Sequence, residues 1–198
     1  MRLAGDAFVR RGGAFVVLAL AVACALLGTM TARAATNTAT GARCRGALTL
    51  PTSSNQALVD SAVACLIDRE RARLRVPALR ANPALGGIAM SLAREMASHG
   101  YFGDDTMTGQ TPWQRIASSP YAVGAQVVAA GQNIGWGTGG LATPQGVVEE
   151  WMRSPPHRLI LLSSSYRDVG AGVAPIAPSS VTDERPGATY TVEFAARG

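Results

Sequence analysis

The 198-residue sequence contains no lysine, only two histidines and only three cysteines. All 18 basic residues are therefore arginine, from which we draw no function. The Gly-x-Ser-x-Gly motif is also missing, which excludes a serine nucleophile on the strand-to-helix elbow of the α/β hydrolases. The sequence shows no internal repeat and no coiled-coil pattern, which excludes a repeat array and a long helical rod.

Residues 1–34 have the features of a secretory signal peptide. Arginines precede an apolar stretch from 14 to 27, and Ala32 and Ala34 form an Ala-Arg-Ala cleavage site. The apolar stretch is too short and wrongly flanked for a comfortable membrane span. We therefore expect an exported protein that begins near Ala35, with no membrane span in the mature form.

Three other interpretations of this N-terminal segment compete with cleavage. One is an N-terminal anchor that is kept instead of cleaved. Another is a twin-arginine export signal at Arg10 and Arg11, but the residues around the pair fit it poorly. A lipoprotein cysteine at Cys24 is disfavoured because the apolar stretch continues past it.

Most of the net charge of +5 belongs to this segment. Removing residues 1–34 takes away four of the 18 basic residues and one of the 13 acidic residues, which leaves a net charge of +2. The remaining 164 residues are enough for one domain with a sizeable core. A net charge this small does not indicate binding to a nucleic acid.

Two cysteines remain after cleavage, Cys44 and Cys65. In an exported chain, the simplest interpretation is one disulfide between them. By lowering the entropy of the unfolded chain, it would stabilise the folded state by roughly 3 kcal/mol. Two free thiols are the alternative.

The chain has helical patterns first and strand patterns last. Residues 35–54 are rich in Ala, Thr, Gly and Ser and are expected to form an extended N-terminal arm; the domain itself is expected over 55–198. A helix is predicted over 56–74, with Arg71 among its largely outward residues. Asn82 is a good N-cap for a second helix.

The later helices and strands follow from similar local signals. In the second helix Pro83 takes the first position, and Gly100 is the expected stop, with His99 in the last turn. Capping-box spacing at Thr111 predicts a short third helix, and Thr143 begins a fourth that ends at Ser154. Strands are predicted over 169–176 and 189–196, joined by a hairpin loop over 177–188; residues 132–137 are expected to be extended or looped. Helices before strands predict an α+β fold with an antiparallel sheet.

Two motifs carry the strongest signal. Residues 131–137 read Gly-Gln-Asn-Ile-Gly-Trp-Gly, and residues 151–158 read Trp-Met-Arg-Ser-Pro-Pro-His-Arg, with His157 on an expected double-proline turn. Together they resemble the signature of the CAP superfamily: the secreted domains of cysteine-rich secretory proteins, insect antigen 5 and plant pathogenesis-related proteins. The resemblance covers about residues 57–196 and implies a three-layer α-β-α sandwich with a central antiparallel sheet.

The resemblance also indicates where a binding cleft should lie. CAP domains gather two histidines and one or two glutamates in a cleft, and some members bind zinc there. Transferred position by position, the second histidine is His157, the first falls on Asp104, and the glutamate of Gly-Glu-Asn-Ile is Gln132. A second glutamate falls near Ser154. With Asn133 beside Gln132, these are the candidate cleft residues.

The replacements weaken such a site for metal chemistry. A carboxamide is a weak neutral ligand for zinc, and no carboxylate able to act as a general base remains at position 132. We therefore expect no cofactor, with zinc as the less favoured alternative. Asp104 could instead pair with His157 and raise its pKa, and Asp105 could substitute for it.

The other candidate residues have simpler interpretations. Ser154 lies three residues before His157, close enough for a hydrogen bond, but is favoured as a turn cap. His99 fits a helix C-terminus better than a ligand position. The three tryptophans are expected in the core. Of the adjacent helix residues Glu149 and Glu150, at least one is expected in solvent.

Two functions compete. The first is an exported, non-catalytic module that binds a small ligand or a cell-envelope component through its cleft. The second is a hydrolase or metal-dependent enzyme that uses His157. The first is favoured because Gln132 and Asp104 stand where an enzyme of this type would keep a carboxylate and an imidazole. Sterol or lipid binding, known for some eukaryotic members, is a third and weaker possibility.

Overall fold

The structure, a computed structural model, describes residues 43–198. The predicted signal peptide over 1–34, with Cys24, lies outside the described residues. The elements in chain order are α1 (Gln56–Arg73), β1 (Arg80–Ala81), α2 (Pro83–His99), α3 (Pro112–Ala117), η1 (Pro120–Ala122), β2 (Val127–Thr138), η2 (Gly139–Ala142), α4 (Pro144–Arg153), α5 (Pro155–Leu161), β3 (Asp168–Ala174) and β4 (Gly187–Arg197). None of the helices in this part of the chain is long and apolar enough to cross a membrane.

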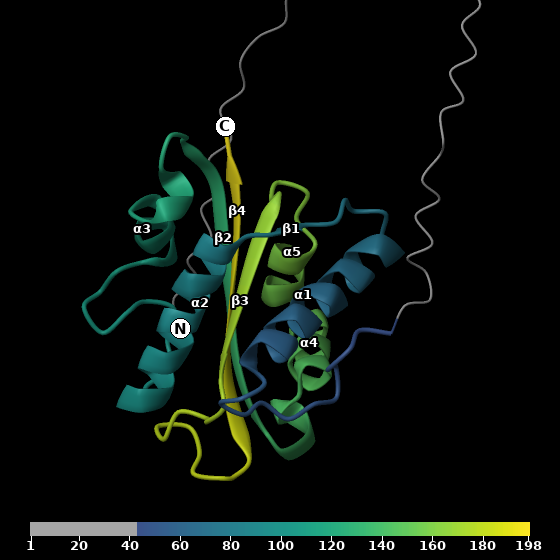
Figure 1. The fold of residues 1–198 in the computed structure, drawn as a ribbon, viewed down its shortest axis with the longest axis vertical. Coiled ribbons are helices and arrows are strands. Elements are labelled where there is room, and N and C mark those ends of the chain that lie inside the picture. Colours follow the sequence, from purple (N-terminus) through teal and green to yellow (C-terminus); the bar gives the residue numbers. More distant parts are fainter. Residues whose placement is uncertain (1–42) are drawn as a thin grey trace, which may run out of the picture. The chain divides into compact units, whose positions relative to one another are not determined.

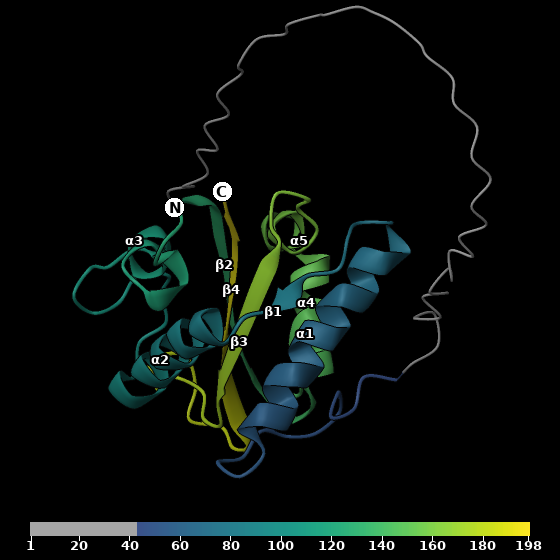
Figure 2. The same ribbon diagram turned by 45° about the horizontal axis from the view of Figure 1, so that its top comes forward.

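The four strands form one sheet in the order β1-β3-β4-β2. The pairs β2–β4 and β3–β4 are antiparallel, as predicted, whereas the two-residue strand β1 adds to β3 in parallel. Helices α2 and α3 cover one face of the sheet, and α1, α4 and α5 cover the other (Figures 1 and 2). The predicted α+β fold with three layers is therefore confirmed.

Local capping determines where the helices begin and end. The Asn82 side chain accepts hydrogen bonds from the backbone N–H groups of Ala84 and Leu85, and Gly100 ends α2 in the left-handed conformation at φ 69°. Thr111 and Gln114 form the predicted capping box of α3. Each of these signals was readable from the sequence because it depends on neighbours only a few residues away.

One local expectation was wrong, and another is narrowed to one of its two alternatives. The double proline does not form a turn: it starts helix α5, where the first positions need no N–H donor, so His157 lies on a helix. Residues 132–137 lie within strand β2.

The start of the described chain, at residues 43–55, is held against helix α1 by the predicted disulfide. Cys44 and Cys65 are bonded, with their Cα atoms 5.7 Å apart. The described part of the expected extended arm contains turns at 45–48 and 53–54, the first with the N–H of Ala47 donating to the carbonyl of Cys44, so it is not extended throughout. The carbonyl of Ala47 in turn accepts a hydrogen bond from the Gln145 N–H at the start of α4.

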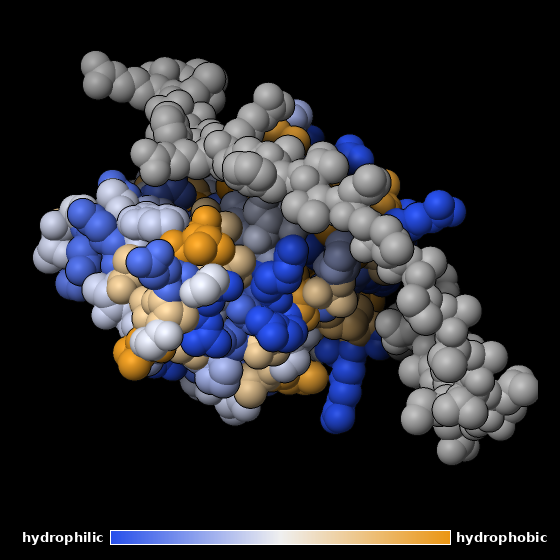
Figure 3. Space-filling model, turned by 90° about the horizontal axis from the view of Figure 1, so that it is seen from above, coloured by the Kyte–Doolittle hydropathy of each residue, from blue (hydrophilic) through white to orange (hydrophobic). Residues whose placement is uncertain are grey.

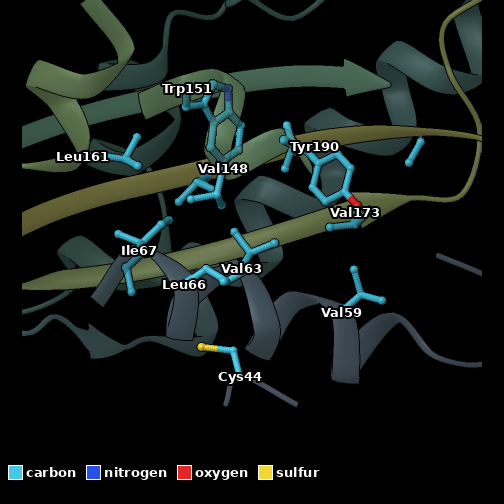
Figure 4. Packing of buried hydrophobic residues seen from close by; sticks show 14 of the residues in the cluster. Cys44, Val59, Val63, Leu66, Ile67, Val148, Trp151, Leu161, Val173 and Tyr190 are labelled. Atoms are coloured by element: carbon cyan, nitrogen blue, oxygen red, sulfur yellow. The ribbon is translucent and has the colours of Figure 1, made fainter. Parts of the chain in front are cut away.

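The main core lies between the sheet and the α1–α4 layer. Apolar side chains of α1 meet those of α4, α5 and the central strands there (Figure 4). Trp151 packs edge-on against Tyr190, with ring centroids 6.5 Å apart, and its indole N–H donates to the carbonyl of Ile134. This bond ties α4 to β2, the strand that carries the candidate site.

Three predictions about burial were wrong, one for an arginine and two for tryptophans. Arg71, expected to face outward, is fully buried, and its guanidinium donates to the backbone carbonyls of Pro77, Leu161 and Ser163. Those carbonyls pair with Nε and Nη1 of the buried guanidinium, and helical periodicity cannot reveal such partners.

The other two expectations concern the tryptophans, which divide between core and surface. Trp151 is buried as expected, but Trp113 and Trp136 are 48% and 39% exposed.

Helix α2 contacts strand β3 through two glycines. A Cβ atom added at Gly172 would lie 2.1 Å from the backbone nitrogen of Met90, and one at Gly170 would lie 2.1 Å from that of Gly86. The helix backbone therefore rests directly on the sheet. This contact sets the position of the loop that follows α2, which contains Asp104.

We predict that Gly172→Ala destabilises the protein by about 3 kcal/mol, because its Cβ would push against helix backbone that cannot move aside alone. Gly87→Ala is the matched control, since a Cβ at Gly87 meets nothing within 4 Å. That variant should gain roughly 0.5–1 kcal/mol from better helix propensity. Urea unfolding of the three proteins provides the comparison. Equal stability of Gly172→Ala and the parent would show that α2 does not rest on β3 in this way.

Candidate functional site

Gln132 and Asp104 are in direct contact. Gln132 lies in β2, directly opposite Glu193 of β4, and is 8% exposed. Its side-chain amide donates to the Asp104 backbone carbonyl and to the Asp104 carboxylate, both at 3.2 Å. The structure therefore brings together two positions that are 28 residues apart in the sequence.

The residue at the centre of this contact is Arg115, which the sequence analysis did not identify. Its Nη2 donates to Gln132 Oε1, to Glu193 Oε1 at 3.3 Å and to the Asp104 carbonyl at 3.1 Å. Its Nη1 donates to the carbonyl of Gln110 at 2.7 Å. Asp104, Arg115, Gln132 and Glu193 form what we call the polar cluster.

Glu193 is the buried carboxylate of the polar cluster. Burial raises the pKa of Glu193 to about 7, although Arg115 beside it favours the charged form; Asp104 adds to the increase. Its Oε2 has no hydrogen-bond partner among the described residues, nor has Arg115 Nε. A carboxylate so placed can gain or lose a proton near neutral pH.

The remaining candidates lie on the other face of β2. Adjacent strand residues point to opposite sides of a sheet, so Asn133 faces away from Gln132. The side-chain amide of Asn133 donates to the backbone carbonyl of His157 at 3.1 Å. The Ser154 hydroxyl and His157 Nδ1 share a hydrogen bond of 2.7 Å. The five candidate residues thus form two groups, one on each side of β2, which is an edge strand of the sheet; the charge of Asp104 on one side still reaches His157 on the other.

The electrostatics of His157 differ from the expectation. Burial lowers the pKa of His157, and the nearby charge of Asp104 raises it by less, so the net shift is downward. No hydrogen bond joins the two side chains in the described structure. The expected increase in the pKa was wrong because burial destabilises the charged imidazolium more than its attraction to the Asp104 carboxylate stabilises it.

The secondary candidates have structural roles or face solvent. His99 lies exposed in the last turn of α2, as predicted. Ser154 is the N-cap residue of α5, but its hydroxyl bonds to His157 instead of capping a backbone N–H. Glu149 and Glu150 are exposed and pair with Arg153.

The donor set of the polar cluster is unfavourable for a divalent cation. Within residues 43–198, no three His, Cys, Asp or Glu side chains gather closely enough to hold a metal ion. The oxygen of Gln132 is directed at Arg115 and its NH2 group at Asp104, so it presents hydrogens where a ligand needs a lone pair. The adjacent guanidinium would repel a metal cation.

One sequence signal could have pointed to this cluster. Strand β4 is buried along nearly its whole length on both faces, and it carries one charged residue in its buried part, Glu193. A buried carboxylate needs a cationic or donor partner. The identity of that partner, Arg115 on α3, depends on the packing of α3 and could not be read from the strand.

Comparisons with known proteins identify the family and agree with the fold. A model of the cysteine-rich secretory protein family, CAP, matches residues 66–192. The uncharacterized protein YkwD of Bacillus subtilis is 29% identical over 107 residues, which are 54% of this chain and 39% of that protein. The chain therefore spans well under half the length of this curated relative.

Two solved structures share the fold. An outer surface protein from Borrelia burgdorferi superposes with a TM-score of 0.57 at 18% identity, over 69% of this chain and 90% of that one. An extracellular protein containing an SCP domain from Bacillus anthracis gives a TM-score of 0.56 at 23% identity, over 73% of this chain and 44% of that one.

We predict that Asp104→Asn lowers the pKa of His157 further, because it removes the charge that favours the imidazolium. Since the folded pKa lies below the unfolded value of about 6.5, this histidine's stabilising contribution is complete above that value. It is lost as the pH falls toward the folded pKa. NMR titration of the His157 ring measures the shift, with Asp105→Asn as the control. Coincident curves for Asp104→Asn and the parent would exclude the electrostatic contact.

We also predict that the polar cluster tolerates one buried carboxylate beside Arg115 but not two. Gln132→Glu should destabilise the parent, because the new carboxylate would lie directly opposite Glu193. In a Glu193→Gln background, the loss in the free energy of unfolding caused by Gln132→Glu should be smaller than in the parent by roughly 0.5–3 kcal/mol. Urea unfolding of the four proteins at pH 8 gives this coupling free energy. A coupling of zero would mean that the two positions do not share Arg115.

Proposed function

The chain belongs to the cysteine-rich secretory protein (CAP) family, and we propose that it is an exported, non-catalytic binding module of that family. It takes up a small ligand or a cell-envelope component at the surface around Asp104 and His157. The proposal rests mainly on one observation, the position of the Arg115 guanidinium inside the polar cluster.

A guanidinium in this position argues against a catalytic metal centre for two reasons. It neutralises Glu193, so no metal ion is required to balance that buried carboxylate. It also donates to the amide oxygen of Gln132, and an amide cannot act as a general base as a carboxylate can. The cluster then serves to fix Asp104 and its loop in place.

The groups left for a ligand are an exposed carboxylate and an imidazole. Asp104 accepts one hydrogen bond from Gln132 and is otherwise exposed. His157 uses Nδ1 for Ser154, which leaves its Nε2 for a ligand. An acceptor and a switchable donor suit recognition of polar groups.

Several observations support export. The disulfide between Cys44 and Cys65 is typical of oxidising compartments. One structural relative is described as extracellular and another as an outer surface protein. The signal-peptide pattern of residues 1–34 agrees with both.

One contact favours a second candidate function. The 2.7 Å hydrogen bond between Ser154 and His157, together with the lowered pKa of His157, resembles a nucleophile beside a neutral base. Against hydrolysis, the bond uses Nδ1 of a residue only three positions away, a spacing that helix geometry alone produces. No acidic side chain hydrogen-bonds to His157 in the described part of the chain to orient it as in a catalytic triad.

Three proteins test the proposal: the parent, His157→Ala and the control His99→Ala, which removes the exposed histidine of α2. We expect no zinc binding by calorimetry that depends on His157 at neutral pH. We also expect no labelling of Ser154 by a serine-reactive fluorophosphonate, because no acidic side chain in the described residues orients His157 as a base. All three proteins should behave alike in both measurements.

Two results would contradict this proposal. Micromolar zinc binding that disappears in His157→Ala but survives in His99→Ala would favour a metal-dependent enzyme. Labelling of Ser154 that depends on His157 would favour a serine hydrolase.

A further inference from the structure

A shallow groove lies beside helix α3, between the helix and the turn that precedes it. Its volume is about 600 Å³. It is lined by residues of the turn and of one face of the helix: Thr108, Gly109, Gln110, Trp113, Gln114, Ala117 and Ser118. None of these residues belongs to the two groups around β2.

The apolar part of the groove is the indole of Trp113. Pro112 takes the first position of α3 and Trp113 the second, and the Trp113 side chain is 48% exposed. An indole is large and rigid, so it offers a flat contact surface at a low cost in conformational entropy. Half-exposed tryptophan is typical of binding surfaces.

The polar part consists of amides and hydroxyls. Gln114 Oε1 accepts hydrogen bonds from the N–H and hydroxyl of Thr111, which leaves the Gln114 NH2 group available as a donor. The Gln110 side chain makes no hydrogen bond within residues 43–198, so its amide can both donate and accept. Amides with both capacities match hydroxyl groups, which also donate and accept.

The walls of the groove are fixed before any ligand arrives. The turn closes through hydrogen bonds from the Gly109 N–H to the Thr106 carbonyl at 2.9 Å and from the Gln110 N–H to the Thr106 hydroxyl at 2.9 Å. The Arg115 guanidinium holds the Gln110 carbonyl at 2.7 Å. Such preorganisation reduces the entropy lost on binding.

No lining residue of this groove is charged. Two other grooves differ in this respect: one contains Arg153 and Arg158, and another contains arginine and glutamate side chains. Where Figure 3 leaves the surface uncovered, apolar residues lie in small groups separated by hydrophilic ones, so that view shows no broad apolar face for a membrane or a helix. Phosphate-rich polymers and anionic lipids would need cationic side chains in the groove.

We propose that this groove binds an uncharged saccharide chain. The C–H face of one sugar ring packs on the Trp113 indole, and its hydroxyls exchange hydrogen bonds with the Gln110 and Gln114 amides. A saccharide combines an apolar ring face with hydroxyls that donate and accept, which is the combination this lining offers. The inference does not depend on the function proposed for Asp104 and His157, because the two sites share no ligand-facing residue.

The test uses the exported chain with its disulfide intact and three uncharged probes: hexamers of N-acetylglucosamine, of β-1,4-linked glucose and of α-1,4-linked glucose. Calorimetry measures the dissociation constant of each, and NMR follows the Trp113 indole N–H. We expect at least one hexamer to bind, with an affinity that is unchanged between low and high salt. Trp113→Ala should weaken it by about tenfold or more, which is about 1.4 kcal/mol.

Two further variants separate stacking from general effects. Trp136→Ala removes the other exposed tryptophan and should leave the affinity within about twofold of the parent's, a difference well below 1 kcal/mol. Trp113→Phe keeps an aromatic face and should retain part of the affinity. A urea unfolding midpoint for Trp113→Ala equal to the parent's shows that its loss of affinity does not come from misfolding.

Three results would overturn the proposal. The first is no binding of any of the three hexamers at millimolar concentration. The second is binding that Trp113→Ala leaves unchanged. The third is binding that weakens steeply with salt, which would indicate a charged site elsewhere.

Discussion

The buried guanidinium of Arg115 is the contact on which the functional surface depends. It holds the loop after α2 through Asp104, the turn before α3 through Gln110, and strands β2 and β4 through Gln132 and Glu193. A buried cation is tolerated only where charge and hydrogen bonds compensate for lost hydration. Each of these segments must therefore be in place for the others to be stable there.

The charge balance around this cation explains the amide at position 132. Glu193 already supplies a buried carboxylate, and its pKa is raised to about 7 even with Arg115 beside it. A second buried carboxylate directly across the strand pair would increase that penalty. Asp104 is exposed, so water can stabilise its charge while its backbone carbonyl serves the cluster.

Close contact between α2 and β3 places this arrangement at one edge of the molecule. The glycines of β3 let the α2 backbone rest directly on the sheet, and Gly100 then ends the helix in the left-handed conformation. The chain leaves α2 at a fixed point and passes Asp104 over β2. On the opposite face of β2, Trp151 and Asn133 bind α4 and α5 to the same strand.

The sequence by itself determined the features that depend on near neighbours or on counting. Asn82, Gly100 and the Thr111 box mark helix ends through contacts within a few residues, and two cysteines after a signal-peptide pattern favoured one pairing. The two motifs indicated the family and, by position, placed Gln132 and Asp104 in one cleft, but the contact between them was not predicted. The spacing of Ser154 and His157 allowed their hydrogen bond, but the favoured interpretation, a cap by the Ser154 side chain, was wrong.

Only the tertiary structure decided which distant groups surround each charge. Alternation in a strand shows that Gln132 and Asn133 face opposite sides, but not that Arg115 lies against one and the carbonyl of His157 against the other. The buried Arg71 and the exposed Trp113 were misjudged for the same reason. Hydration and Coulomb energies depend on distances through space, and those are set when the three layers pack.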